Sequence, residues 1–335
     1  MLRINITLLF LLSLFGPQSI RVSAVDRPSP PEQPVSGPGG ADRIFDSVSA
    51  TRYGSRPTGY WIFEPVVESE EDRQVAFPLV IFFHGFTAVD PRTYLEWIEH
   101  IVTGGAIVVY PDYQTLNPLT MRPTEYLGNA LAGIKDALER MSTAEHLQVD
   151  LTNVAVVGHS AGGVLAFNYA SVAAASGLPE PSVLIPVQPG GCRGCDAGIS
   201  SLVGMPLGVA AKVNQDALVL VIVSEDDTIV GTGPGAKIWT SLVDAGHPNA
   251  DLVMIKTDRH GDPDLVSDHF MPMTGLGGSV DALDWFGPWK LLDLLMSCSF
   301  SGLECDDAIG NSQAQAYMGS WSDETPVTTA LVRSG

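Results

Sequence analysis

Short apolar runs alternate with longer segments of mixed polarity along most of the chain. The runs are rich in Val, Ile, Leu and Phe and end in Gly, Pro or polar residues, a pattern typical of buried strands. They span residues 60–64, 77–83, 105–110, 154–157, 183–187, 218–223 and 252–257. Apolar positions at helical spacing predict helices over residues 91–102, 124–140, 164–175, 236–245 and 282–297.

Strands that are apolar throughout and alternate with helices predict a mostly parallel, twisted sheet with helices on both faces. In sheets of this kind, ligands bind outside the carboxyl ends of the strands. Four of the predicted strands end in polar or glycine-rich sequence at this edge, at His84-Gly85, Ser160, Asp227 and His260. We therefore expect these residues to lie close together.

The pentapeptide Gly158-His159-Ser160-Ala161-Gly162 separates the strand at residues 154–157 from a predicted helix. Strand, G-x-S-x-G and helix together form the context of a nucleophile elbow, in which the serine lies on a sharp, strained turn. Glycine is needed at both ends because side chains there would collide with the neighbouring strand and helix. The alternative interpretation is an ordinary Gly/Ser turn.

A serine hydroxyl is a weak nucleophile at neutral pH, and it needs a base whose tautomer is fixed by a third group. In the hydrolase order the acid and then the histidine follow the serine. Asp226 and Asp227 are adjacent after the strand at residues 218–223, and either could instead form a turn. Asp112 is a weaker candidate because it precedes Ser160.

Two histidines after the last predicted strand compete for the role of the base. His260 follows the strand at residues 252–257 by three residues and is preferred by position. His269 lies nine residues further on in a loop-like segment and is the alternate. The prediction for the catalytic set is therefore Ser160, Asp227 and His260, with Asp226 and His269 as alternates.

Together these motifs resemble those of an α/β-hydrolase, in a layout similar to the dienelactone-hydrolase, chlorophyllase and cutinase-like polyester-hydrolase branches. The resemblance covers about residues 60–297 and implies the α/β-hydrolase fold, with no metal or organic cofactor. Residues 186–215 depart from the pattern where family members often place a cap. Their length predicts a short, lid-like insert.

The resemblance also implies roles for particular residues. The H-G-x sequence that ends at Phe86 corresponds to the oxyanion loop, so the N–H groups of Phe86 and Ala161 are expected to hold the oxyanion. Asp227 precedes Val230 by three residues, similar to the family's G-x-x-D-x-x-V spacing. Ser224 replaces the first glycine of that spacing, so the choice between Asp226 and Asp227 stays open.

The first 24 residues have the pattern of a secretory signal: a charged start, an apolar run at 4–15 and the cleavage site Val22-Ser23-Ala24. Residues 25–42 are rich in Pro and Gly and predict a linker. Residues 43–335 are long enough for one catalytic domain. We therefore expect a secreted or periplasmic protein with no stable membrane anchor after cleavage.

The formal net charge is −20. Removal of residues 1–24, which include Arg3 and Arg21 and no acidic residue, leaves 16 basic and 38 acidic residues, a net charge of −22. A chain this acidic is a poor partner for nucleic acid or an anionic membrane. Simple solubility explains most of the charge.

The four cysteines favour disulfides in an exported chain and allow three pairings. The local pairs, Cys192 with Cys195 and Cys298 with Cys305, are preferred because each closes a short loop. The C-x-x-C spacing of Cys192 and Cys195 also fits a zinc half-site or a redox pair, but no second metal-binding motif accompanies it.

The sequence thus predicts an exported serine hydrolase that cleaves small or polymeric carboxylic esters through an acyl-enzyme. A peptidase or amidase with the same site is the first alternative, because the chemistry is shared. A non-catalytic binding protein on the same scaffold is the second, because a fold does not imply an activity. The sequence leaves the acyl and alcohol groups and the oligomeric state open.

Overall fold

A single, mostly parallel β-sheet forms the centre of the molecule. The structure is a computed structural model that describes residues 27–195, 203–275 and 277–335. Within these ranges nine strands are arranged in the order β1-β2-β4-β3-β5-β6-β7-β8-β9. Strands β3 to β8 are parallel to one another, and β1, β2 and β9 are antiparallel to their neighbours. The strands are β1 (Val48–Tyr53), β2 (Tyr60–Pro65), β3 (Ala76–Phe83), β4 (Ile107–Pro111), β5 (Gln148–His159), β6 (Val183–Val187), β7 (Leu218–Ser224), β8 (Ala250–Ile255) and β9 (Leu331–Ser334). The expected α/β-hydrolase sheet is confirmed.

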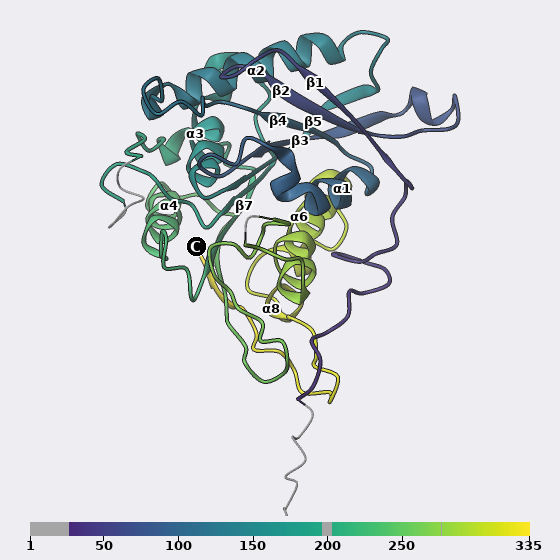
Figure 1. Cartoon of the computed structure of the whole chain (residues 1–335), viewed down its shortest axis with the longest axis vertical. Helices are drawn as coiled ribbons and strands as arrows, with labels where there is room; N and C mark the ends of the chain where they lie inside the picture. Colours follow the sequence, from purple (N-terminus) through teal and green to yellow (C-terminus); the bar gives the residue numbers. More distant parts are fainter. Residues whose placement is uncertain (1–26, 196–202, 276) are drawn as a thin grey trace, which may run out of the picture.

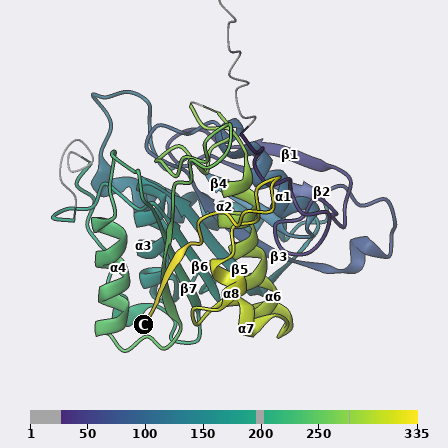
Figure 2. The same ribbon diagram turned by 90° about the horizontal axis from the view of Figure 1, so that it is seen from below.

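Helices cover both faces of the sheet, as predicted (Figures 1 and 2). One core joins the sheet to α2 (Tyr126–Met141), α3 (Ala161–Ser176) and α4 (Gly233–Asp244). A second core joins the other face to α1 (Leu95–Thr103) and α6 (Lys290–Ser301). Along β3, Leu79 and Ile81 belong to the first core and Val80 and Phe82 to the second. Burial on both faces explains why the strand sequences are apolar throughout.

The apolar pattern missed both edge strands, β1 and β9. Most of their residues are exposed or only half-buried, so they show no run of apolar residues. The predicted helix at 282–297 is also divided in two, with α5 (Ala282–Asp284) separated from α6 by a wide turn at Trp285–Trp289. The break is explained by Pro288, which lacks a backbone N–H, and by Gly287, whose dihedral angles are not helical.

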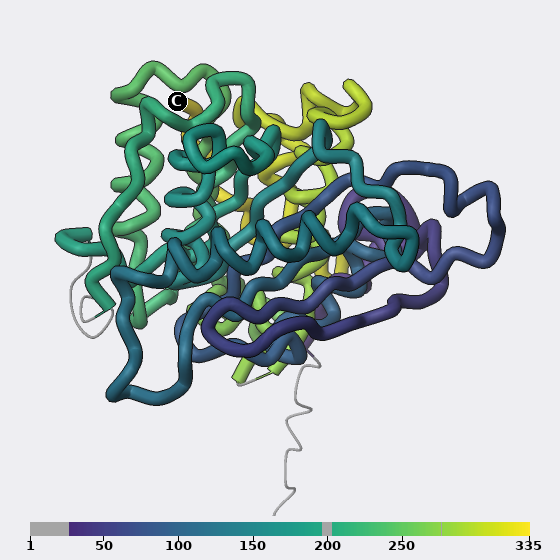
Figure 3. The backbone as a smooth tube through the Cα atoms, turned by 90° about the horizontal axis from the view of Figure 1, so that it is seen from above, coloured from purple at the N-terminus to yellow at the C-terminus, as the bar shows by residue number. Residues whose placement is uncertain are grey.

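The Pro- and Gly-rich segment before β1 lies along the surface and makes defined hydrogen bonds to distant parts of the chain. The carbonyl of Pro28 accepts from the N–H of Asp262 at 2.9 Å, and the N–H of Gly39 donates to the carboxylate of Asp293 at 2.9 Å. The tube view shows the backbone from above, at 90° to the view of Figure 1, with the β1–β2 hairpin in purple (Figure 3). The predicted signal at residues 1–24 lies outside the described residues.

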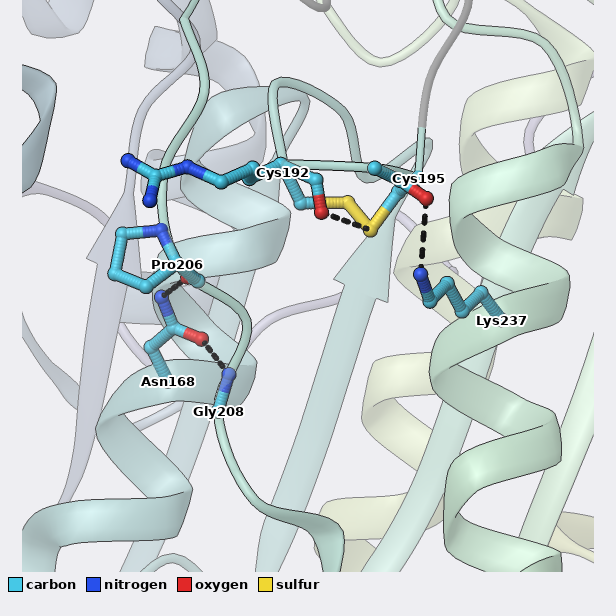
Figure 4. The surroundings of a disulfide bond; sticks show 8 residues. Asn168, Cys192, Cys195, Pro206, Gly208 and Lys237 are labelled. Atoms are coloured by element: carbon cyan, nitrogen blue, oxygen red, sulfur yellow. Dashed lines mark hydrogen bonds between the residues drawn. A yellow bond between two sulfur atoms is a disulfide. The ribbon is translucent and has the colours of Figure 1, made fainter.

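Both disulfides are the predicted local ones. Cys298 in α6 is bonded to Cys305 at the start of α7 (Cys305–Ala308), and Cys192 is bonded to Cys195 in the insert after β6. Figure 4 shows how the insert is held: the Asn168 side chain, on α3, donates to the Pro206 carbonyl at 2.9 Å. Residues 196–202 of the insert are not among those described. In the described ranges no helix is both long enough and apolar enough to cross a membrane.

Candidate active site

Ser160 lies on the sharp turn between β5 and α3, with φ 57° and ψ −121°. Its N–H donates to the Val187 carbonyl at 2.9 Å. A Cβ atom on Gly158 would lie 2.0 Å from the carbonyl oxygen of Gly162, and one on Gly162 would lie 2.1 Å from that of Phe83. Both positions therefore require glycine, as the steric argument from the sequence expects, and the turn holds Ser160 at the carboxyl ends of the strands.

A chain of hydrogen bonds joins Ser160, His269 and Asp227. Nε2 of His269 is 3.0 Å from the Ser160 Oγ, and Nδ1 of His269 is 2.8 Å from Oδ2 of Asp227. All three residues are buried. A carboxylate can only accept, so Nδ1 carries the proton and Nε2 is left with a lone pair toward the serine hydroxyl. This tautomer can take up the Ser160 proton.

The carboxylate of Asp227 is held by two backbone groups as well as by His269. Its Oδ1 accepts from the N–H groups of Ile229 at 2.9 Å and Val230 at 3.0 Å. Burial alone would raise the pKa of Asp227, but the hydrogen bonds from His269 and these two N–H groups hold it below its ordinary value. Asp227 is therefore charged at neutral pH and can stabilise a protonated His269.

The structure does not bring His260, the histidine preferred from the sequence, to this site. Its Nε2 pairs with Asp323 at 2.8 Å, and its side chain is 40% exposed. Asp226 also points elsewhere and forms an ion pair with Arg259 at 2.8 Å. The loop after β8 explains the difference, because an antiparallel bridge between Asp258 and Leu265 turns the chain back. This turn carries His269, not His260, over the end of β7.

The start of α3 and the loop after β3 border the same cavity, since Ala161 and Phe86 both line it beside Ser160. In the part of the chain that the structure describes, the N–H groups of Ala161 and Phe86 have no hydrogen-bond acceptor. Gly85 lies against the elbow, since a Cβ atom on it would be 3.5 Å from the Ser160 Cβ. The two N–H groups are therefore free to bind an oxyanion formed next to Ser160.

The loop after β3 is fixed by buried polar groups. The His84 side chain is fully buried, and its Nε2 is 2.9 Å from the carbonyl oxygen of Asp112. Burial lowers the pKa of His84 to about 4, so the ring is neutral at pH 7. The Asp112 carboxylate pairs with Arg52 at 2.7 Å and makes no contact with Ser160. Asp112 therefore anchors this loop through its backbone carbonyl, and its side chain is not part of the serine's hydrogen-bond chain.

A cavity of about 430 Å³ opens beside Ser160. No charged side chain lines it among the described residues. Its walls are the following residues: Phe86, Pro118, Met121, Pro123, Ser160, Ala161, Gly190, Gly191, Val203, Ile229 and Val230. A larger groove of about 640 Å³ lies where β5 begins, at the opposite edge of the sheet, and none of the candidate site residues lines it. The cavity at Ser160 therefore fits an uncharged, apolar group.

Two residues that contact this site were missed from the sequence. Tyr94 and Gln188 both hydrogen-bond to His159, the second residue of the pentapeptide. Neither lies in a motif, so no pattern in the sequence singles them out. Across the described ranges, no group of three His, Cys, Asp or Glu side chains could hold a metal ion.

Comparison with known proteins identifies a family for this chain. The model of the chlorophyllase family matches residues 49–250, which include Ser160 and Asp227. The chain is 28% identical over 127 residues to "Chlorophyllase-1, chloroplastic" of Citrus unshiu, covering 37% of this chain and 38% of that protein. It is 30% identical over 113 residues to the "Triacylglycerol lipase" of Mycobacterium tuberculosis, covering 33% of this chain and 24% of the lipase. The matches thus span less than two-fifths of these relatives.

Solved structures that align with this chain include esterases. A fungal esterase from Rhizomucor miehei aligns with a TM-score of 0.48 and 17% identity, over 64% of this chain and 76% of the esterase. An alpha/beta hydrolase from a Medee basin deep-sea metagenome library aligns with a TM-score of 0.49 and 16% identity, over 64% of this chain and 84% of the hydrolase.

Proposed function

The chain belongs to the chlorophyllase family, a family of esterase- and lipase-like hydrolases, and from this premise we propose that it cleaves carboxylic esters through an acyl-enzyme on Ser160. The observation that carries the proposal is the hydrogen-bond chain from Ser160 through His269 to Asp227 at the edge of an apolar cavity. A nucleophile, a base with the required tautomer and a third group are the parts that serine catalysis needs.

In the first half of the reaction, the Ser160 Oγ attacks the ester carbonyl carbon while Nε2 of His269 takes its proton. The carbonyl oxygen becomes an oxyanion, which accepts from the N–H groups of Phe86 and Ala161. Each such donor contributes about 3 kcal/mol of transition-state stabilisation in comparable enzymes. The C–O bond to the alcohol then breaks, and the alcohol leaves with the proton from His269. Throughout, Asp227 stabilises the imidazolium.

In the second half, His269 takes a proton from water, and the hydroxide attacks the acyl carbon. The bond to the Ser160 Oγ breaks, Ser160 regains its proton from His269, and the carboxylic acid leaves. The cavity supports an uncharged ester with an apolar group beside the reacting carbon, because a charged group would lose its water there without finding a partner.

The test combines covalent labelling with turnover. We expect a fluorophosphonate probe to label the unaltered protein and nitrophenyl esters to be hydrolysed. Ser160→Ala should lose both, whereas Ser176→Ala, at the exposed end of α3, should retain both. Full turnover by Ser160→Ala would refute the mechanism. An absence of labelling in the unaltered protein would favour a binding protein, and faster cleavage of aminoacyl amides than of esters would favour a peptidase or amidase.

We further propose that residues 1–24 direct export and that the catalytic domain spans residues 43–335. The two disulfides support export, because such bonds persist in oxidising compartments. The intact mass of the protein recovered outside the cytoplasm tests this proposal. A mature chain that begins at Val25 is the expected result, and retention of residues 1–24 would contradict it.

A further inference from the structure

His159, the residue before the serine, is fully buried and has no part in the proton transfers above. Both of its ring nitrogens are hydrogen-bonded. Nδ1 is 2.7 Å from the hydroxyl of Tyr94, and Nε2 is 2.9 Å from Oε1 of Gln188 and 3.0 Å from the carbonyl oxygen of His269. His159 is thus a buried polar side chain with three hydrogen-bond partners next to Ser160, and these contacts need a positional or chemical explanation.

The direction of each hydrogen bond follows from its partners. The amide nitrogen of Gln188 donates to the carbonyl of Asp268, so its Oε1 must accept from His159. Nε2 of His159 therefore carries the proton and is shared between Gln188 and the His269 carbonyl. Nδ1 is then an acceptor, and the Tyr94 hydroxyl donates to it. The Tyr94 oxygen in turn accepts from the N–H of Gly85 at 3.0 Å.

Burial and the nearby His269 hold the pKa of His159 far below its ordinary value, at about 3. The ring is therefore neutral across the working pH range, and its tautomer does not change. The rings of His159 and His269 are 4.8 Å apart. When His269 is protonated during catalysis, His159 remains neutral and places no second positive charge beside it.

One end of this hydrogen-bond chain is the oxyanion loop. Gly85 directly precedes Phe86, so the bond from the Gly85 N–H to Tyr94 orients the peptide units next to the Phe86 donor. Tyr94 is itself fully buried and packs against Phe82 at a ring separation of 5.1 Å. The hydroxyl of Tyr94 therefore has little freedom to move.

The other end of the chain is the loop that carries the base. Gln188 holds the carbonyl of Asp268 and His159 holds the carbonyl of His269, so two successive peptide units of this loop are fixed. Gln188 directly follows β6, is fully buried and has φ 44°, an unusual value for a residue with a side chain. It also donates to Ser224, the last residue of β7. The loop is thus tied to two central strands.

We infer that His159 is a positioning residue: through Tyr94 and Gln188 it aligns the oxyanion loop with the loop that carries His269, on either side of Ser160. The inference rests on the proposed function. Its physical basis is that catalysis depends on alignment, since a misplacement of about 1 Å can lower a rate roughly 100-fold.

The test uses Tyr94→Phe and His159→Gln, singly and together. Tyr94→Phe keeps the ring and removes both bonds at the hydroxyl. His159→Gln places an amide near the position of Nε2 and breaks the bond to Tyr94. Both single variants should lower kcat at least about tenfold with KM within about twofold. Both substitutions break the bond between the Tyr94 hydroxyl and Nδ1 of His159. The fold-loss of kcat in the double variant should therefore be clearly smaller than the product of the two single losses.

Tyr169→Phe is the matched control. Like Tyr94, Tyr169 is buried and its hydroxyl donates a hydrogen bond, in this case to the Pro179 carbonyl at 2.9 Å. It lies outside the hydrogen-bond chain of His159. It should lower Tm about as much as Tyr94→Phe while kcat stays within about twofold. The rate at which a fluorophosphonate labels Ser160 should fall in the Tyr94 and His159 variants and not in this control.

Two outcomes would overturn the inference, and they are distinguishable. If the unaltered protein turns over esters and is labelled, but Tyr94→Phe and His159→Gln keep kcat within about twofold, the positioning role is wrong and the proposed function stands. If the unaltered protein is neither labelled nor active, the proposed function fails and the positioning role fails with it.

Discussion

At the scale of single residues, the backbone of Ser160 stores strain. Its φ of 57° with ψ of −121° lies in a region that residues with side chains rarely adopt, and such conformations are unfavourable by about 1–3 kcal/mol. Backbone bonds hold it there: its N–H donates to Val187, and its carbonyl accepts from the N–H groups of Gly163 at 2.9 Å and Gly190 at 3.0 Å. The strain places the hydroxyl where His269 can reach it.

The first prediction separates the two histidines. His269→Gln should lower kcat by roughly 10⁴-fold or more, because Ser160 would lose its base. His260→Gln should leave kcat within about twofold, because His260 contacts Asp323 at the surface. Steady-state ester hydrolysis at several pH values measures both. A large loss of kcat in the His260 variant with normal activity in the His269 variant would contradict the geometry.

At the scale of elements, Lys290 joins α6 to α8 (Gln313–Ala316). Its Nζ donates to the carbonyl oxygens of Ala314 at 2.8 Å, Gln315 at 3.3 Å and Tyr317. The last carbonyls of a helix have no partner within it, so the lysine satisfies groups that would otherwise be unpaired. Burial lowers the pKa of Lys290 to about 7.

The second prediction follows from this contact. Lys290→Met keeps much of the apolar volume and leaves the three carbonyls without their donor, so the free energy of unfolding should fall by about 2–3 kcal/mol. The kcat of the folded protein should not change. Urea unfolding measures the loss, and Lys135→Met, at an exposed position of α2, is the control that should stay within about 0.5 kcal/mol. Equal stability of the two variants would argue against this role of Lys290.

The start of α5 contains a buried carboxyl group. Oδ2 of Asp284 accepts from the N–H of Asp281 at 2.9 Å, whereas its Oδ1 is buried and has no hydrogen-bond partner in the described part of the chain. Burial raises the pKa of Asp284 well above its ordinary value, and the nearby Asp281 and Glu96 raise it further. At pH values between the ordinary carboxyl pKa and this raised native pKa, the native state therefore binds a proton that the unfolded chain has lost.

The third prediction is a pH dependence with a definite sign. Since the pKa is raised on folding, the contribution of Asp284 to stability falls as pH rises above about 4 and through the native pKa. Asp284→Asn keeps an acceptor without the charge. Between pH 5 and pH 8 the unfolding free energy of the unaltered protein should therefore fall more than that of the variant.

Urea unfolding of both proteins at the two pH values measures the difference. Asp216→Asn, at an exposed turn, should behave like the unaltered protein. A parallel pH dependence in all three proteins would show that Asp284 is already ionised in the native state.

At the scale of the whole molecule, three segments far apart in the sequence lie side by side below the sheet (Figure 1). They are residues 27–42, the loop after β8 and the tail at residues 319–328. Ser29 accepts from the N–H of Ser322 at 3.0 Å through its carbonyl, and Asp258 accepts from the N–H of Thr328 at 2.7 Å. The loop that carries His269 is thus braced by both ends of the described chain.

The fourth prediction concerns this packing. A chain that begins at residue 43 should unfold more easily than one that begins at residue 25, by about 2–4 kcal/mol, because the bonds of Pro28, Ser29 and Gly39 are lost. The kcat should fall less than tenfold, since none of these residues contacts Ser160. Thermal unfolding and ester turnover of the two chains test this. Equal stability would show that residues 25–42 behave as a free linker.

Much of this architecture could be predicted from the sequence because its determinants are local. The central strands can be recognised in the sequence as apolar runs, because both of their faces are buried. The turn at Ser160 is specified by Gly158 and Gly162, because no other residue avoids their backbone neighbours. The disulfides close short loops, so spacing alone favoured the correct pairs.

The tertiary structure alone decided which histidine faces Ser160. His260 and His269 both follow β8, and their distance along the chain says nothing about which one returns to the sheet. The bridge between Asp258 and Leu265 and the contacts of Gln188 make that choice. Such contacts join residues that are far apart in the chain, and their strength depends on burial that exists only after the sheet has formed. Local sequence therefore determined the fold and the serine, and tertiary packing decided its partners.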